Sequence, residues 1–208
     1  MSSDVYLITL VFHDHSASLD GPIADYVARL GVRSLPDIPF HMVDLIHGHG
    51  GYEGLGPELR KPMLYAFATF VRTLPVSYVT LRFDAAEIGD RSGLEARIRR
   101  SVSDFLFSKL EEFQAYDEVA VYYDGGSAVV SKAVRAAFDF VLARNVASYR
   151  KPVYSERRLM QVADYLTSIE LAAIRYDRQQ QSKSYVRFFG SRNSLKRNLL
   201  KPARSLRK

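Results

Sequence analysis

Runs of apolar, β-branched residues alternate along this chain with stretches in which apolar residues recur every three or four positions. The runs, at 5–12, 76–83 and 118–126, predict buried strands. The periodic stretches predict amphipathic helices over about 21–30, 57–74, 94–113, 128–146 and 156–176. Pro62 must kink the second of these helices or mark its true start. Strands that alternate with helices predict an α/β chain in one domain.

Two stretches do not fit either pattern cleanly. Residues 40–56 are expected to form a short strand that opens into a glycine-rich loop, and residues 148–156 an extended segment. The 208 residues are long enough for one good core and short for two. The sequence has no run of membrane-spanning length, no signal-peptide pattern at its start, and no cysteine. These features predict a cytoplasmic protein without membrane contact and exclude disulfides and thiolate zinc sites.

The net charge of +6 is concentrated at the C-terminal end. Residues 190–208 contain seven lysines or arginines and no acid, whereas residues 1–189 carry a net charge of −1. We therefore expect an α/β domain over 1–189 and a basic C-terminal tail over 190–208. Such a tail can neutralise phosphates, which predicts nucleic acid as a partner. The alternative is a solvated helix end that keeps the protein soluble.

Asp164 lies among apolar residues in the helical stretch RLMQVADYLTSIEL, residues 158–171. A carboxylate is almost never fully buried without a partner. Gln161 and Ser168 lie about one turn to either side, so the three residues form a narrow polar strip. One interpretation is that Asp164 binds a divalent cation, which offsets the cost of burying the anion. The other is an exposed face on which Asp164 pairs with Arg157 or Arg158.

Asp124 closes an apolar strand and precedes two glycines. Ligands of open α/β sheets collect at the carboxyl ends of strands, and glycines there allow close approach. The alternative is an aspartate that starts a turn. An acid at a strand end together with an acid on the last long helix suits a ribonuclease-H-type site, where carboxylates hold Mg²⁺ or Mn²⁺.

Three histidines and an aspartate (His41, Asp44, His47 and His49) fall within nine residues. Imidazole and carboxylate together can bind Zn²⁺ or another transition metal. Their spacing matches no zinc pattern, so we interpret His47 and His49 as loop residues. His41 lies beside the strand-like run and is the better candidate for a site neighbour.

Six segments resemble, in order and rough spacing, the family catalogued as domain of unknown function 3800. They are LVFHDHS (10–16), HMVDLIHG (41–48), VAVYYDGGS (119–127), RLMQVADYL (158–166), SKS (182–184) and FFGSRNSLKRNLLKP (188–202). The resemblance implies a ribonuclease-H-like mixed sheet flanked by helices and a metal-dependent nuclease activity. It places Asp124 and Asp164 on two expected acidic positions, His41 on a typical histidine, and Lys183 on the lysine of the SK segment.

The chain departs from this family at its start. The family begins with a strand that ends in Asp-Glu-Ser-Gly, before the strand that resembles residues 5–12, and this motif is not in the sequence. Loss of a central strand would expose apolar sheet edges, so we expect the native gene to encode a longer N-terminus.

Two functions and one assembly state follow as hypotheses. The first function is a Mg²⁺- or Mn²⁺-dependent phosphodiester hydrolase: Asp124 and Asp164 bind metal, His41 donates a proton or orients a ligand, and Lys183 contacts phosphate. The second is a non-catalytic module of the same fold that binds nucleic acid or another partner. A homo-oligomer that pairs through strand 5–12 is compatible with both functions.

Overall fold

A computed structural model describes residues 5–84, 91–123, 127–142, 146–151 and 154–208. Its elements divide into two compact units. Unit 1 comprises residues 1–8 and 81–156, and unit 2 comprises residues 9–80 and 157–208. Within the described residues, no helix is long and apolar enough to cross a membrane.

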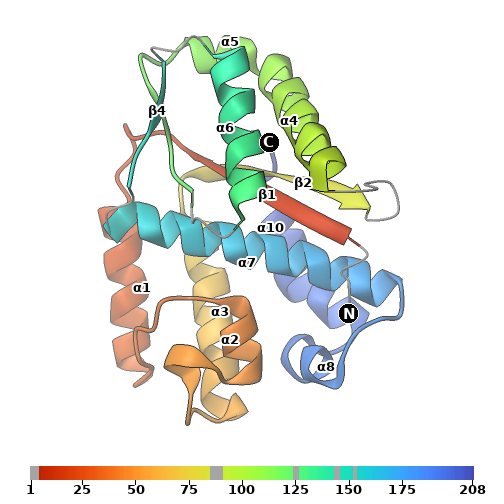
Figure 1. The fold of residues 1–208 in the computed structure, drawn as a ribbon. Helices are drawn as coiled ribbons and strands as arrows, with labels where there is room; N and C mark the ends of the chain where they lie inside the picture. Colours follow the sequence, from red (N-terminus) through yellow and green to blue (C-terminus); the bar gives the residue numbers. More distant parts are fainter. Residues whose placement is uncertain (1–4, 85–90, 124–126, 143–145, 152–153) are drawn as a thin grey trace. The chain divides into compact units, whose positions relative to one another are not determined.

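The chain is mixed α/β and mostly helical, which confirms the predicted class (Figure 1). The first half contains β1 (Val5–His13), α1 (Asp20–Val32), α2 (Met42–His47), the 3₁₀ turn η1 (Gly50–Tyr52), α3 (Pro57–Thr73), β2 (Val76–Asp84) and α4 (Arg91–Ser108). The second half contains α5 (Leu110–Gln114), β3 (Val119–Val121), α6 (Ala128–Val141), β4 (Ala147–Tyr149), α7 (Tyr154–Asp177), α8 (Lys183–Phe189), α9 (Arg192–Leu195), the π-helical turn η3 (Lys196–Leu200) and α10 (Lys201–Arg204).

The described strands form two separate pairs, β1 with β2 and β3 with β4. In unit 1, β3 and β4 run parallel with Val119 opposite Ala147, and α4 packs along α6. A continuous ribonuclease-H-like sheet is not formed by the described strands, so that finer assignment stays a prediction.

The core of unit 2 gathers apolar side chains from α1, α2, α3, α7 and the last helices. Helix α7 contributes Val162, Leu166 and Ile169, each with no exposed surface. These residues recur at the spacing that predicted this helix, because one face of a 3.6-residue helix meets the core.

The short strand that we expected at the start of residues 40–56 is wrong, because Met42 begins the short helix α2. Met42, Leu45 and Ile46 are all buried and lie at helical spacing, three and four residues apart. Gly48 ends the helix with a φ of 75°, a left-handed conformation that favours glycine. Helix α3 begins at Pro57, so Pro62 lies inside the helix and does not mark its start.

Candidate functional site

Asp164 is half-buried on α7 and holds the first turn of α2. Its Oδ2 accepts a hydrogen bond from the Met42 N–H at 2.8 Å. One turn earlier on α7, the Gln161 Oε1 accepts from the Phe40 N–H at 3.1 Å. The first N–H groups of a helix have no partner inside the helix, so a carboxylate at this place satisfies one of them. The predicted polar strip on α7 therefore binds the backbone that leads into α2.

Arg158, which we considered as a partner of Asp164, has one of the most buried charged side chains of unit 2, with 4% exposed. Its guanidinium donates to the Asp37 carboxylate at 2.7 Å and to the Gln161 Oε1 at 3.2 Å. Burial of this cation is offset by a charged acceptor, as expected for an arginine inside a protein.

His41 and Asp44 lie at the same end of α2. His41 is the extended residue before the helix, and its Nδ1 lies 3.1 Å from the Asp44 Oδ2. Tyr52 lies near enough to Asp44 and Asp164 for both charges to affect its ionisation. Burial, and to a smaller extent the charges of Asp44 and Asp164, raise the pKa of Tyr52 to about 12. Two carboxylates and one imidazole thus surround the beginning of α2.

Lys183 is the exposed first residue of α8, and the Ser182 Oγ caps this helix by accepting from the Tyr185 N–H at 3.2 Å. Helix α8 packs against α2. Burial raises the pKa of Tyr185, and the Asp164 charge raises it as well. The helix that carries Lys183 therefore lies close to Asp164.

Three of the four predicted site residues, namely His41, Asp164 and Lys183, thus lie on segments that meet around α2 in unit 2. Asp124 lies outside the described residues, and its distance from Asp164 stays untested. Among the residues that the structure describes, no group of three or more His, Asp or Glu side chains forms a metal-binding cluster.

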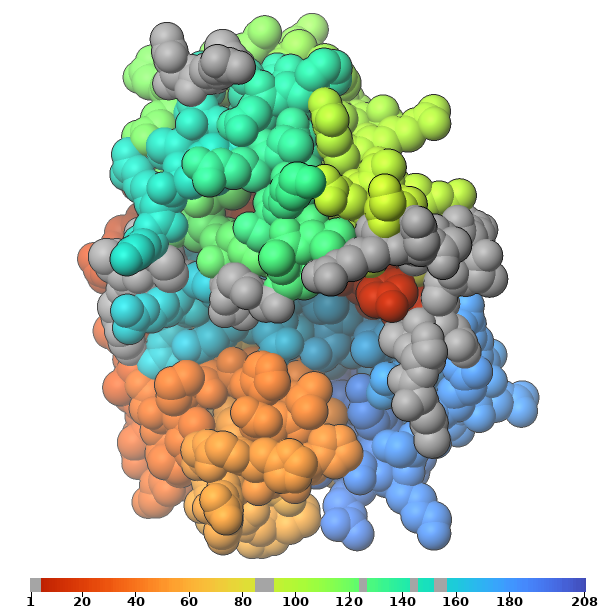
Figure 2. Space-filling model, viewed as in Figure 1, coloured from red at the N-terminus to blue at the C-terminus, as the bar shows by residue number. Residues whose placement is uncertain are grey.

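The basic C-terminal segment belongs to unit 2, with its apolar side chains buried and its cations exposed. Leu195, Leu199, Leu200 and Ala203 are buried in the core. The last residues also extend the edge of β2, because the Tyr78 N–H donates to the Leu206 carbonyl at 3.0 Å. Figure 2 shows this segment in blue on the surface of unit 2. Sequence reasoning did not predict that residues 190–208 pack into the core, because their seven lysines and arginines obscured the spacing of the apolar residues.

Ten lysines or arginines and no acid lie between residues 178 and 208. Arg192 pairs with Asp177 of α7, and two further arginines pair with Glu170. Five exposed cations of the segment form no ion pair with the residues that the structure describes: Lys183, Arg187, Lys196, Arg197 and Lys201. We call these five side chains the basic surface.

Glu170 was not predicted, although it is more buried than Asp164, with 4% exposed. Its carboxylate accepts from the Tyr78 hydroxyl at 3.0 Å, from Arg204 Nη2 at 2.8 Å and from Arg207 Nη2 at 2.7 Å. Burial raises the pKa of Glu170, but the arginines and the tyrosine outweigh burial and hold it below 4.5. The sequence contained a signal for this residue, because Glu170, like Asp164, lies among the apolar residues of α7.

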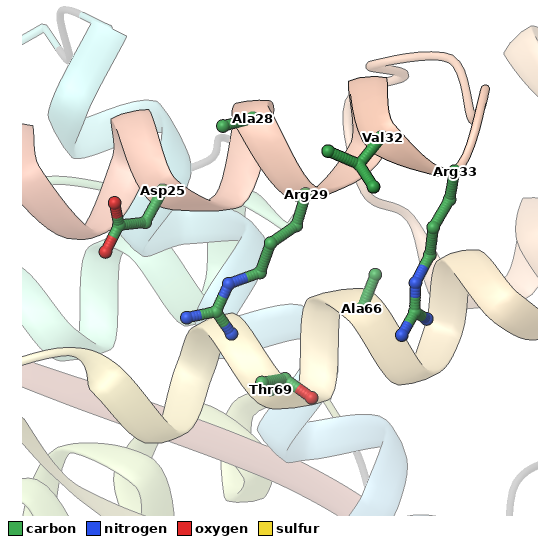
Figure 3. A pocket seen from close by; sticks show the side chains of 7 residues that line it. All are labelled: Asp25, Ala28, Arg29, Val32, Arg33, Ala66 and Thr69. Atoms are coloured by element: carbon green, nitrogen blue, oxygen red, sulfur yellow. The ribbon is translucent and has the colours of Figure 1, made fainter.

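A cavity of about 450 Å³ lies between α1 and α3 and contains none of the predicted site residues. Arg29 and Arg33 extend over it from α1 toward α3 (Figure 3). Ala28 and Ala66 leave the space open because their side chains are short. Asp25 also lines the cavity, so its charges are mixed.

Comparisons with protein-family models, with curated proteins and with solved structures find no match for this chain. The resemblance to domain of unknown function 3800 therefore stays a prediction.

Proposed function

We propose that the protein binds nucleic acid and that the basic surface contacts the phosphate backbone. The observation that carries this proposal is the set of five exposed cations that have no ion-pair partner among the described residues. Buried neighbours such as Leu195 and Leu199 hold the backbone from which Lys196, Arg197 and Lys201 extend. Lysine and arginine contacts to phosphate supply most of the sequence-independent affinity for nucleic acid.

Salt dependence of binding tests this proposal. Each phosphate contact releases counterions, so Lys196→Gln with Lys201→Gln should lower the slope of log affinity against log salt by about 1.8 for duplex DNA. The matched control is Lys61→Gln with Arg72→Gln on α3, which removes the same charge from exposed positions outside the basic surface. Fluorescence anisotropy at several salt concentrations measures both slopes. Equal changes in the two double variants, or no binding at low salt, would refute the proposal.

Metal-dependent phosphodiester hydrolysis is a second candidate, and one observation favours it. Asp164, His41 and Asp44 gather at the start of α2, against which the helix bearing Lys183 packs. In this reading Asp124 and Asp164 bind Mg²⁺ or Mn²⁺, which would polarise a phosphate and activate water. Lys183 contacts the phosphate, and His41 donates a proton or orients a ligand. A ribonuclease-H-like arrangement of the strands belongs to this candidate.

Asp164→Asn separates the metal role from the capping role. An asparagine oxygen can still accept from the Met42 N–H, so the fold should be retained. A neutral amide binds a hard divalent cation much more weakly than a carboxylate does. We expect Mn²⁺ to raise the melting temperature of the wild type and to support cleavage, and the variant to lose both effects. Wild-type protein that shows neither effect would leave only the binding function.

A further inference from the structure

Helices α4 and α6 of unit 1 pack side by side (Figure 1). Two phenylalanines, one from each helix, lie exposed and in contact with each other. Phe107 of α4 is 49% exposed, and Phe140 of α6 is 61% exposed. Neither belongs to the buried faces of these helices, where Val102, Leu106 and Phe138 are at most 4% exposed. Each ring is about half exposed and therefore forgoes roughly 1 kcal/mol of the stabilisation that full burial of a phenylalanine provides. The exposed parts of these two rings therefore do not contribute to the core of unit 1.

The two rings meet edge to face, with centroids 5.9 Å apart and planes at 89°. The guanidinium carbon of Arg99 lies 5.6 Å from the centroid of Phe140. Arg99 and Phe107 of α4 therefore both lie against Phe140 of α6. A cation is thereby held against an aromatic ring that is largely open to solvent. We call Arg99, Phe107 and Phe140 the aromatic cluster.

The size and charge of the aromatic cluster favour a nucleic-acid base over a protein partner. Two half-exposed rings offer on the order of 200 Å², well below the roughly 800 Å² per partner of a stable protein interface. Arg97 and Arg100 are also exposed on the same helix, and Arg100 lies 3.9 Å from the Asp104 carboxylate, so Arg99 is the cation that lies against the rings. Positive charge beside open aromatic faces is the usual arrangement of surfaces that bind single strands, because bases stack while phosphates meet the cations.

The geometry points to the aromatic cluster as a stacking site for unpaired bases of single-stranded nucleic acid. This inference rests on the proposed binding function and names its substrate class. In a duplex both faces of each base are already stacked on neighbours, so the rings contribute only when bases are unpaired. The protein should therefore bind a single strand more tightly than a duplex of the same sequence.

The test compares Phe107→Ala/Phe140→Ala with Phe107→Leu/Phe140→Leu in the full chain. Fluorescence anisotropy measures binding to a single-stranded oligonucleotide and to its duplex at fixed salt. Stacking of one base contributes a factor of about ten in affinity. We expect both double variants to lose roughly tenfold or more on the single strand and to keep the duplex affinity. Leucine should fail like alanine because it is apolar but has no aromatic face.

Several outcomes would overturn the inference. Single-strand affinity that is unchanged, or that falls together with duplex affinity, excludes stacking at these rings. Leucine variants that bind like wild type would assign the effect to apolar contact alone. A dimer in sedimentation that dissociates only in the alanine variant would make the rings an interface between copies of the chain. Persistent salt-dependent duplex binding in these cases leaves the proposed function intact, whereas absence of all binding refutes both.

Discussion

Replacement of Glu170 by glutamine should destabilise unit 2 through its C-terminal helices. The carboxylate accepts hydrogen bonds from Tyr78, Arg204 and Arg207. A hydrogen bond to a charged group contributes roughly 1.5–3 kcal/mol, and breaking a fully buried ion pair costs about 3–5 kcal/mol. Arg204 and Arg207 are 45% and 43% exposed, so water can solvate them in the variant. We therefore expect a loss of about 2–3 kcal/mol, toward the lower end of these ranges.

Asp177→Asn is the matched control for this change. Asp177 also lies on α7 and also pairs with an arginine, Arg192, but both side chains are more than half exposed. Exposed pairs contribute at most about 1 kcal/mol, so this variant should unfold close to wild type. Urea unfolding followed by circular dichroism gives both free energies, and hydrogen exchange of residues 195–206 locates the loss. Equal losses in the two variants would refute the assignment of Glu170 as the anchor of these helices.

The effect of Glu170→Gln should also depend on pH. The pKa of Glu170 is raised by burial but lowered overall by its arginine and tyrosine partners. A folded-state pKa below the unfolded value of about 4.5 contributes stability that is complete above 4.5. The contribution is lost as the pH falls through the lowered folded-state pKa. The gap in unfolding free energy between wild type and variant should therefore close in acid and stay constant near neutrality.

Three further results are expected. Asp164→Ala should lower the free energy of unfolding by about 1 kcal/mol in urea because the Met42 N–H loses its acceptor, while Asp164→Asn should lose less; equal losses would contradict capping. Leu199→Ala, at a fully buried position, should cost about 2–5 kcal/mol, and a loss below 1 kcal/mol would place the last helices outside the core. Burial raises the pKa of Tyr52 and Tyr78 to about 12, so these two tyrosines should ionise well above the ordinary tyrosine pKa of 10.0 in an ultraviolet titration. Their stabilising contribution is complete below pH 10 and is lost as the pH rises through 12; ionisation of every tyrosine near pH 10 would contradict this burial.

Periodicity along the sequence identified most of the long elements. The strands at Val5–His13 and Val76–Asp84 and the helices at Asp20–Val32 and Tyr154–Asp177 agree with the predicted ranges within a few residues. These predictions succeeded because a long apolar face must be buried whatever its tertiary partner is. Helix α2 was missed because its six residues span fewer than two turns, too few for a period to show. Its helical state depends on burial of Met42, Leu45 and Ile46 against the rest of unit 2.

For the candidate site, too, one part was predictable from the sequence and another depended on the tertiary structure. The sequence by itself determined that α7 carries a carboxylate among apolar residues, because Asp164 falls inside the helical apolar pattern of residues 158–171. Only the tertiary structure decided which group meets that carboxylate, since the Met42 amide is 122 residues away along the chain. The tertiary structure also decided that the C-terminal helices bury their apolar side chains in the core, and that two of their arginines pair with Glu170. Sequence patterns report which face of an element is apolar, whereas the partner of a polar group is set by long-range packing that no local pattern records.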